Sequence, residues 1–225
     1  MSTTNTRTVA IAHRRRPMAY LELTKPDVSF LVVFTTLAGY ALGATGPLDW
    51  LRMAHTVIGT TLVAAGTASL NHYVERGTDA LMRRTASRPL PGGVLAPIEA
   101  ILFGVTLIAA GMIDLLLATN LLAASLALAT SVIYLGVYTP LKTRTVQATL
   151  IGALPGAMPP LIGWAAARGT LGGGSWILFA ILFLWQFPHF HAIAWMYRED
   201  YARAGIRMLP VVDPQGRRTF AQIIF

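Results

Sequence analysis

Six long apolar runs divide this chain, and they restrict its fold more than any other feature. The runs cover residues 28–45, 53–73, 97–117, 120–138, 147–167 and 175–196. Each is close to the ~20 residues that an α-helix needs to cross the hydrocarbon core of a bilayer. No alternation of apolar and polar residues, which is typical of strands, competes with them. We therefore predict an all-α fold, a polytopic helical membrane bundle with six spans in this chain.

Composition supports a membrane protein and excludes several function classes. Hydrophobic residues make up 54% of the chain and charged residues 12%, with a mean hydropathy of +0.55. Soluble domains carry about 25% charged residues, so the polar residues here are too few to cover a soluble protein of this size. The chain has no cysteine, which excludes disulfides, thiolate nucleophiles and thiolate metal sites.

The positive charge predicts an orientation rather than a nucleic-acid partner. The formal net charge is +8, and every Lys and Arg except Arg52 and Arg168 lies on one side of the predicted spans. Cytoplasmic loops of membrane proteins carry such an excess of basic residues. We predict a multi-pass protein of the cell (cytoplasmic) membrane, with its N-terminus and active site on the cytoplasmic side and no nucleic acid as a partner.

Two segments frame the membrane part of the chain. Residues 1–24 are basic and lack the apolar stretch and cleavage site of a signal peptide, so we predict a cytoplasmic N-terminal tail. Residues 25–225 are predicted to form the intramembrane domain. A new apolar run over 219–225 is too short to cross a bilayer, which predicts a domain that is truncated at its C-terminus.

One amide and two carboxylates follow one another at four-residue spacing where the second apolar run ends. Asn71, Glu75 and Asp79 project from nearly the same face of a helix. Oxygen ligands in this arrangement suit Mg²⁺ that carries a phosphate. The alternative is a polar helix end whose acids pair with neighbouring arginines. Because ionisable groups at a membrane are costly, we predict a functional metal face.

Basic residues surround this face on the same side of the membrane. Basic loops also follow from topology alone, but beside an acidic metal face they suit a Mg²⁺-diphosphate, because cations neutralise the oxygens that the metal leaves free. The candidate diphosphate contacts are Lys25, Arg76, Arg83, Arg84, Arg88, Lys142 and Arg144. The polar segment 198–205, which includes Asp200 and Tyr201, is either a second phosphate or metal contact or a solvated loop.

The sixth run contains a proline between aromatic and histidine residues, in the segment 185–191. Pro188 predicts a local opening of the helix, whose free carbonyls would line a cavity. His189 and His191 point to different faces and are therefore not expected to bind one metal together. A lone histidine in an apolar helix is commonly a core residue, and the functional alternative is a base or an axial haem ligand.

Glycines and prolines recur between residues 152 and 164, within the fifth run. They predict a break or kink in that span. Small residues there either pack two helices closely, as is common in membranes, or let a flat or long apolar substrate enter the bundle.

Together these blocks closely resemble the haem O synthase (protohaem IX farnesyltransferase) family, a branch of the intramembrane UbiA-type prenyltransferases. The matching motifs are Asn71-xxx-Glu75-Arg76-xx-Asp79-xx-Met82-xx-Thr85, Tyr138-Thr139 with Leu141-Lys142, Pro159-Pro160-Leu161-Ile162-Gly163-Trp164, Pro188-His189-Phe190 and Asp200-Tyr201-xx-Ala204-Gly205. The wider superfamily carries a second acidic motif with carboxylates four residues apart. Here Met196 and Ala204 stand four residues either side of Asp200, so that spacing is absent.

The resemblance implies transfer of a farnesyl group from farnesyl diphosphate to a vinyl group of protohaem (haem B), giving haem O, with Mg²⁺ as cofactor. It implies that Asn71, Glu75 and Asp79 bind the metal and act in catalysis, and that His189 is also catalytic, by orienting or ligating the haem. It assigns the diphosphate to the basic residues named above together with Asp200 and Tyr201. It also implies about nine spans of bilayer-crossing length in the family, a lipid bilayer around them, and a haem A synthase as a partner.

Two rival functions stay open at this point. A prenyltransferase for an aromatic or quinone-precursor acceptor would share the metal face and the fold, although the Pro188-His189-Phe190 block favours haem. A non-catalytic membrane transporter would place its polar groups near the bilayer midplane along a path. In this sequence the polar groups gather at one face instead.

Overall fold

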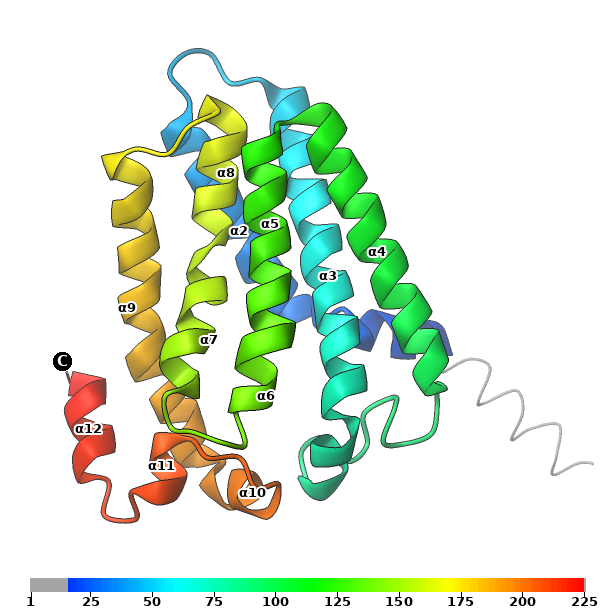
Figure 1. Ribbon diagram of the computed structural model, residues 1–225, viewed down its shortest axis with the longest axis vertical. Coiled ribbons are helices and arrows are strands. Elements are labelled where there is room, and N and C mark those ends of the chain that lie inside the picture. Colours follow the sequence, from blue (N-terminus) through cyan, green and yellow to red (C-terminus); the bar gives the residue numbers. More distant parts are fainter. Residues whose placement is uncertain (1–15, 225) are drawn as a thin grey trace, which may run out of the picture.

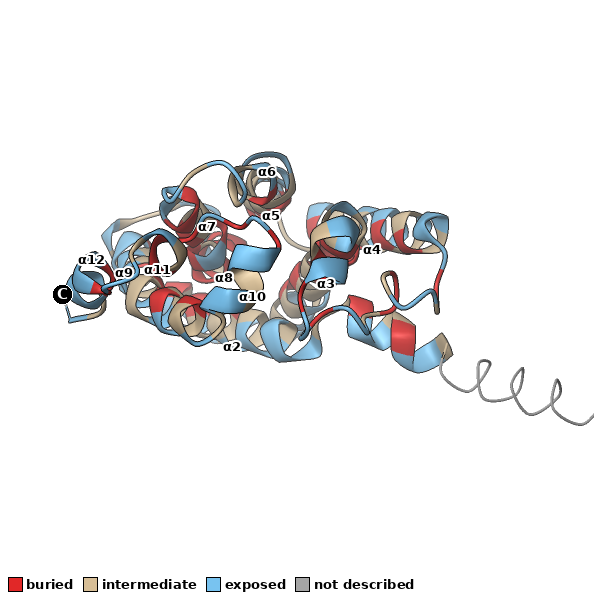
Figure 2. Cartoon of the chain, turned by 90° about the horizontal axis from the view of Figure 1, so that it is seen from below, coloured by how far each residue is buried: buried red, intermediate tan, exposed pale blue. Residues whose placement is uncertain are grey.

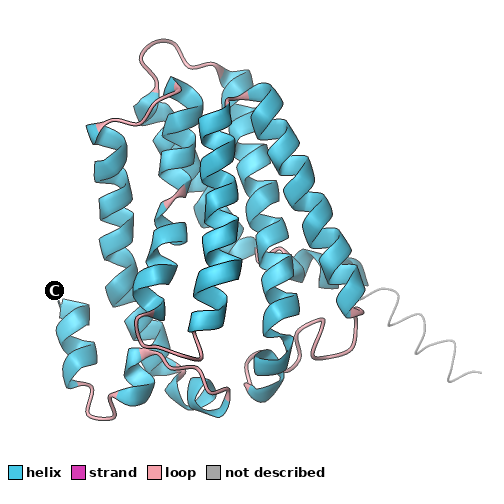
Figure 3. Ribbon diagram, viewed as in Figure 1, coloured by secondary structure: helices cyan, strands magenta, loops and turns pink. Residues whose placement is uncertain are grey.

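The computed structural model describes residues 16–224, and these form a bundle of long helices without strands (Figures 1 and 3). Six helical segments are long and apolar enough to cross a membrane, which confirms the predicted number of spans. The first three and the sixth are single helices: α2 (Pro26–Gly43), α3 (Trp50–Leu81), α4 (Pro97–Ala118) and α9 (Gly173–Met196). The fourth joins α5 (Leu121–Val132), a π-helix η1 (Ile133–Tyr138) and α6 (Thr139–Leu141), and the fifth joins α7 (Ala148–Ala157) and α8 (Pro159–Arg168).

Short helices follow the sixth span. They are α10 (Arg198–Arg203), α11 (Leu209–Val212) and α12 (Arg217–Ile224). Figure 1 shows all three at the same end of the bundle as α6 and the last turns of α3. The segments that carry the predicted site residues therefore meet at one end of the molecule.

The second span is longer than its apolar run predicts. The run ends at residue 73, whereas α3 continues to Leu81 without a break at Gly77. The extra turns are polar, and their side chains form hydrogen bonds and ion pairs with other elements, so tertiary contacts extend the helix beyond its apolar part. As a result α3 carries the amide and both carboxylates of the predicted metal face beyond the apolar core.

Glycines allow the close packing that holds the spans together. A Cβ atom at Gly66 would lie 2.5 Å from the Gly104 carbonyl oxygen, and one at Gly111 would lie 2.5 Å from the Gly59 carbonyl oxygen. Only glycine therefore fits where α3 meets α4. A Cβ atom at Gly163 would lie 2.1 Å from the carbonyl oxygen of Thr36, so α2 and α8 approach in the same way. Small residues at helix contacts are the usual means of packing in membranes.

Proline has opposite outcomes in the last two spans. The fifth span breaks at Met158, between Pro155 and Pro159, which confirms the predicted interruption. In α9, by contrast, the helix continues through Pro188, so the predicted local opening there is wrong. A proline inside a membrane helix is tolerated where the surrounding protein compensates for the lost hydrogen bond.

The end of the predicted N-terminal tail is helical. Residues 16–23 form a helix, and its Ala19 and Leu23 are buried against Leu90 and Leu95 of the loop after α3. The rest of the predicted tail, 1–15, lies outside the described residues, as does Phe225. Residues 16–23 therefore belong to the folded part, because their apolar side chains cover the inner face of that loop.

The outer surfaces of the spans are apolar. Figure 2 shows exposed residues along the outward faces of the helices. They include Phe30, Leu117, Ile181 and Leu184, all more than half exposed. In a bilayer such side chains contact lipid chains of similar polarity, so no other part of the protein has to cover them.

Candidate active site

A cleft of about 430 Å³ lies between α2, α3, the fourth and fifth spans and α9. Most of its lining is apolar, contributed by side chains such as Val28, Leu31 and Ile162. Its polar lining residues include Lys25, Asp27, Thr60, Thr67, Thr130, Ser131, Tyr134, Tyr138, Gln186 and His189. Ligand sites of enzymes commonly combine such an apolar lining with a few polar groups and have volumes of about 300–1,000 Å³.

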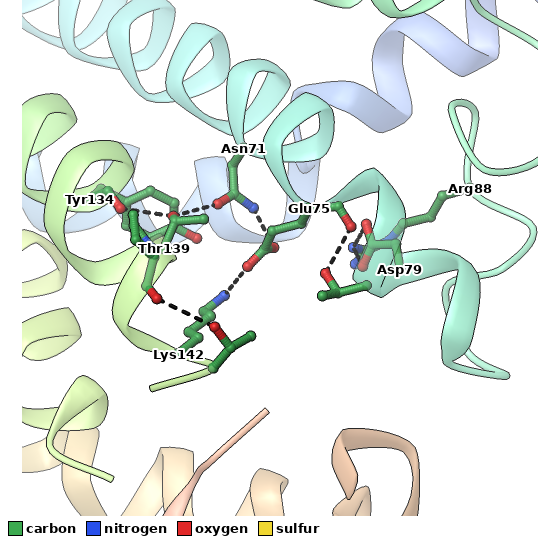
Figure 4. Close-up of polar contacts among 10 residues, drawn as sticks. Asn71, Glu75, Asp79, Arg88, Tyr134, Thr139 and Lys142 are labelled. Atoms are coloured by element: carbon green, nitrogen blue, oxygen red, sulfur yellow. Dashed lines mark hydrogen bonds and ion pairs between the residues drawn. The ribbon is translucent and has the colours of Figure 1, made fainter. Parts of the chain in front are cut away.

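A hydrogen-bonded network connects α3 to the end of the fourth span (Figure 4). The Asn71 amide donates to Glu75 Oε2 at 2.7 Å, and Lys142 Nζ donates to Glu75 Oε1, also at 2.7 Å. The Thr139 hydroxyl donates to Asn71 Oδ1 at 2.9 Å and lies 2.8 Å from the Tyr134 carbonyl oxygen. Three predicted site residues from two separate spans are therefore brought together in one network.

Lys142 is held from two sides. Its ammonium lies 4.6 Å from the centre of the Tyr138 ring in addition to its ion pair with Glu75. Burial disfavours the charged form of this lysine, but the Tyr138 and Glu75 oxygens outweigh that effect and raise the pKa of Lys142 well above its ordinary value. The site thus contains a permanent cation beside the Glu75 carboxylate.

Asp79 has a different partner. Both of its carboxylate oxygens accept hydrogen bonds from Arg88 Nη1, at 3.0 and 2.8 Å, and its side chain is only 1% exposed. The Thr85 hydroxyl also donates to the Asp79 carbonyl oxygen at 2.8 Å. Figure 4 shows Glu75 directed toward Asn71 and Lys142, and Asp79 directed toward Arg88. The structure thus joins Asn71 and Glu75 but not Asp79 in one network.

The oxygen atoms of Glu75 and Asn71 are ligands that suit Mg²⁺. Glu75 provides a carboxylate and Asn71 an amide oxygen, and Mg²⁺ is commonly bound through one or two carboxylates plus substrate phosphates. Within residues 16–224, no group of three or more His, Asp and Glu side chains is placed to hold a metal by itself. Mg²⁺ at this position would therefore share its coordination with oxygens of a substrate.

Three more predicted residues line an open groove of about 730 Å³ between the loop after α3 and α10. They are Arg83, Arg84 and Asp200. The backbone N–H of Arg84 donates a hydrogen bond to Asp200 Oδ2 at 3.2 Å. The Arg84 guanidinium lies 4.9 Å from the centre of the Tyr197 ring. Asp200 also forms an ion pair with Arg203. The groove thus combines three arginines with two carboxylates, Glu199 and Asp200, and Arg203 already pairs with the second of these.

The remaining predicted residues have separate environments. Lys25, with a left-handed backbone, caps α2 and lines the cleft. The Arg76 guanidinium packs on the Tyr73 ring. The backbone carbonyl of Arg144 accepts a hydrogen bond from the Arg207 guanidinium. Tyr201 packs against the buried cluster around Met82. His189 lines the cleft and stacks on Trp185, with ring centres 4.5 Å apart.

Sequence reasoning noticed Tyr138 and Thr139 only as part of a family motif, and it gave no residue of the π-helix a role in the site. Tyr134 and Tyr138 line the cleft, and Thr139 follows them in the network. Single π-turns inside α-helices occur frequently at functional sites, but an apolar run read for length alone does not reveal one. The available signal was the polar Tyr138-Thr139 pair so close to Lys142.

The sequence matches known proteins over most of its length. The model of the UbiA prenyltransferase family matches residues 32–225. A protoheme IX farnesyltransferase from Solibacter usitatus is 54% identical over 214 residues, which cover 91% of this chain and 73% of that protein. One of the same name from Koribacter versatilis is 51% identical, over 91% of this chain and 67% of that protein.

Solved structures share the fold at low sequence identity. A UbiA homologue from Archaeoglobus fulgidus, bound to DMAPP and Mg²⁺, superimposes with a TM-score of 0.76 at 17% identity, over 91% of this chain and 72% of that one. A structure of digeranylgeranylglyceryl phosphate synthase superimposes with a TM-score of 0.74 at 20% identity, over 92% and 72% of the two chains. These likenesses establish a helical membrane fold for this chain.

Proposed function

This chain belongs to the UbiA prenyltransferase family, and from that premise we propose that it transfers a farnesyl group from farnesyl diphosphate to a vinyl group of protohaem, giving haem O. It is a multi-pass membrane protein of this family. The observation that carries the proposal is the apolar cleft, whose polar residues include Lys25 and Tyr138 and which lies beside the Glu75–Lys142 network. A long hydrocarbon with a charged head needs these two environments next to each other.

The polar end is proposed to bind the diphosphate. Asn71 and Glu75 would hold Mg²⁺, which when bound neutralises diphosphate oxygens. Lys142 is already positioned at Glu75 and would contact the phosphate oxygens that remain. Asp79, which is buried against Arg88, supports the loop that carries Arg83 and Arg84. Lys25, Arg76, Arg144, Asp200 and Tyr201 complete the proposed diphosphate contacts.

The cations of the site favour departure of the diphosphate. As the C1–O bond of the farnesyl group breaks, negative charge grows on the leaving group and positive charge on the allylic carbon. Cations that are already in place stabilise the leaving group without reorganisation. The apolar lining of the cleft holds the hydrocarbon, because apolar surface that leaves water is stabilised.

The proposed acceptor is the vinyl group of protohaem. Its terminal carbon attacks the allylic carbon, which leaves a cation on the vinyl carbon next to the porphyrin ring. The oxygen of water then bonds to that cation and releases one proton, which gives the hydroxyl group. The stacked rings of Trp185 and His189 offer a flat surface beside the cleft, on which a planar acceptor would rest. His189 is thus proposed to orient the haem.

Orientation and partners follow from the same proposal. The network and the groove lie at the end of the bundle where the basic loops are, so we place the site on the cytoplasmic side of the cell membrane. The substrates are farnesyl diphosphate and protohaem. A haem A synthase that receives the haem O is the proposed protein partner.

A prenyl-transfer assay in membranes that contain this protein tests the proposal. Protohaem, farnesyl diphosphate and Mg²⁺ are supplied, and products are separated by hydrophobicity and identified by mass. A more hydrophobic haem that forms only with Mg²⁺ and is lost in Glu75→Gln supports the acceptor and the metal site. Prenylation of an aromatic acid without a haem product would reject protohaem as the acceptor. Transfer to neither acceptor by a folded protein would reject the enzymatic function.

A further inference from the structure

A buried amide side chain lines the cleft without a role in the diphosphate site. Gln186 of α9 is only 4% exposed, yet it is one of the residues that line the cleft. Its Nε2 donates to the carbonyl oxygens of Ala153 at 3.0 Å and of Leu182 at 3.2 Å. Both N–H groups are therefore used, and they hold the amide plane between α7 and α9.

The amide oxygen of Gln186 remains available. Within residues 16–224 no hydrogen-bond donor reaches Oε1, and Oε1 is also not among the fully buried polar atoms that lack a partner. Oε1 lies over Gly156, where a Cβ atom would approach it to 2.0 Å. Gly156 also lines the cleft, so the absence of its side chain leaves room for the oxygen. One acceptor is thus fixed in a mostly apolar wall.

An acceptor in such a wall has a cost unless it finds a donor. A buried carbonyl without a hydrogen bond destabilises the folded protein. The hydrocarbon of the farnesyl group has no hydrogen-bond donor, and the oxygens of the diphosphate are hydrogen-bond acceptors, so neither can donate to Oε1. A small donor such as water fits the position better than either part of that substrate.

The reaction proposed above requires one water molecule in this apolar cleft. Attack of the vinyl carbon forms the new C–C bond and leaves a cation on the neighbouring carbon. If no nucleophile is positioned, that cation loses a proton and gives an alkene. If water is positioned, its oxygen bonds to the cation and an alcohol results. The outcome therefore depends on where a water molecule is held.

We infer that the side-chain oxygen of Gln186 positions the water molecule that captures this cation. Oε1 accepts one O–H of the water, which leaves an oxygen lone pair free to form the C–O bond. The second proton then passes to the imidazole of His189, which lies three residues further along α9 and lines the same cleft. Gln186 is thus a positioning residue that decides between alcohol and alkene. The inference rests on the proposed function.

The test is the product ratio of Gln186→Met in membranes with protohaem and farnesyl diphosphate. Methionine has similar length but no carbonyl oxygen. We expect the ratio of hydroxylated product to the alkene, which is lighter by one water molecule, to fall about 10-fold, as for one lost hydrogen bond. Farnesyl diphosphate should still be consumed. The matched control is Gln147→Met at the exposed start of α7, which should keep the wild-type ratio.

A second variant keeps the inference testable if Gln186→Met fails to fold. Gly156→Ala places a Cβ atom against Oε1 and should shift the ratio in the same direction with Gln186 still present. Wild-type ratios in both folded variants, with only slower turnover, would overturn the inference. Absence of any prenylated haem from the wild-type protein would instead reject the proposed function, so the two failures are distinguishable.

Discussion

Two ion pairs one helical turn apart on α3 have different origins. Glu75 pairs with Lys142, which follows the fourth span, whereas Asp79 pairs with Arg88 in the loop directly after α3. The two acids differ in exposure: the Glu75 side chain is 13% exposed and that of Asp79 only 1%, whereas their cations are similar, 17% for Lys142 and 21% for Arg88. The first pair joins two distant elements beside the cleft, and the second attaches a neighbouring loop to the end of the helix.

The comparison teaches that equal spacing along a helix does not give equal roles. The first pair is partly exposed, so its groups can exchange one partner for an incoming ligand. In the second pair the Asp79 carboxylate is buried, and a buried charge that loses its partner is strongly destabilising. We therefore expect Glu75 to govern activity and Asp79 to govern stability, and the variants below test that division.

The largest expected effect is the loss of activity in Glu75→Gln. We expect the rate of prenyl transfer to fall by about 10³-fold, since charge stabilisation at a developing ion is commonly worth that much. The protein should remain folded, because glutamine keeps the size of glutamate. Initial rates in membranes, normalised to folded protein, measure the effect. An equally large loss in Asp79→Asn, at unchanged stability, would break the proposed division.

Asp79→Ala should chiefly lower stability. Removal of the carboxylate removes both hydrogen bonds from Arg88, whose partly exposed side chain can turn toward water, and we expect the free energy of unfolding to drop by about 2 kcal/mol. Chemical unfolding in detergent, followed by helical content, measures the change. Glu22→Ala, at an exposed residue of the first helix, is the control and should be close to neutral. Unchanged stability in Asp79→Ala would contradict the anchoring role of this pair.

Lys142→Met should weaken binding of farnesyl diphosphate. We expect the KM for farnesyl diphosphate to rise about 10-fold, because one charge-assisted hydrogen bond is lost and Glu75 keeps a charge without a partner. Lys142→Arg should restore part of the affinity, because the positive charge returns. A KM that stays at the wild-type value in Lys142→Met would show that the lysine has only a structural role.

The smallest expected effect belongs to Thr139→Val. The variant removes the hydroxyl that donates to Asn71, and we expect a loss of activity of about 5-fold, as for one neutral hydrogen bond. Thr143→Val in the exposed loop that follows should retain wild-type activity. If both variants behave alike, Thr139 does not orient Asn71.

Much of the fold follows from local sequence. Six apolar runs of bilayer length predicted six spans, and the prolines around Met158 predicted the break in the fifth. The end of α3 did not follow, because residues 75–79 are mostly polar or charged and Glu75 and Asp79 depend on partners from other segments. The π-helix also escaped prediction, because Ile133–Tyr138 continue the predicted apolar run 120–138 without an interruption.

The site was predictable in its members and not in its pairings. Spacing placed Asn71, Glu75 and Asp79 on one helix, and charge placed Lys142 and Arg88 on the same side of the membrane. The sequence has no information on which cation each acid meets, since that depends on how loops fold back. Gln186 was not singled out, because a single glutamine in an apolar helix has no characteristic spacing.

The sequence by itself determined the number of spans and the residue types at the polar end, because hydrophobicity and charge act on each segment independently. Only the tertiary structure decided that Glu75 meets Lys142 beside a cleft while Asp79 is buried against Arg88. Those contacts join residues that are far apart in the chain or lie across a turn. These contacts form only when whole helices pack against one another, and a local sequence pattern does not predict that packing.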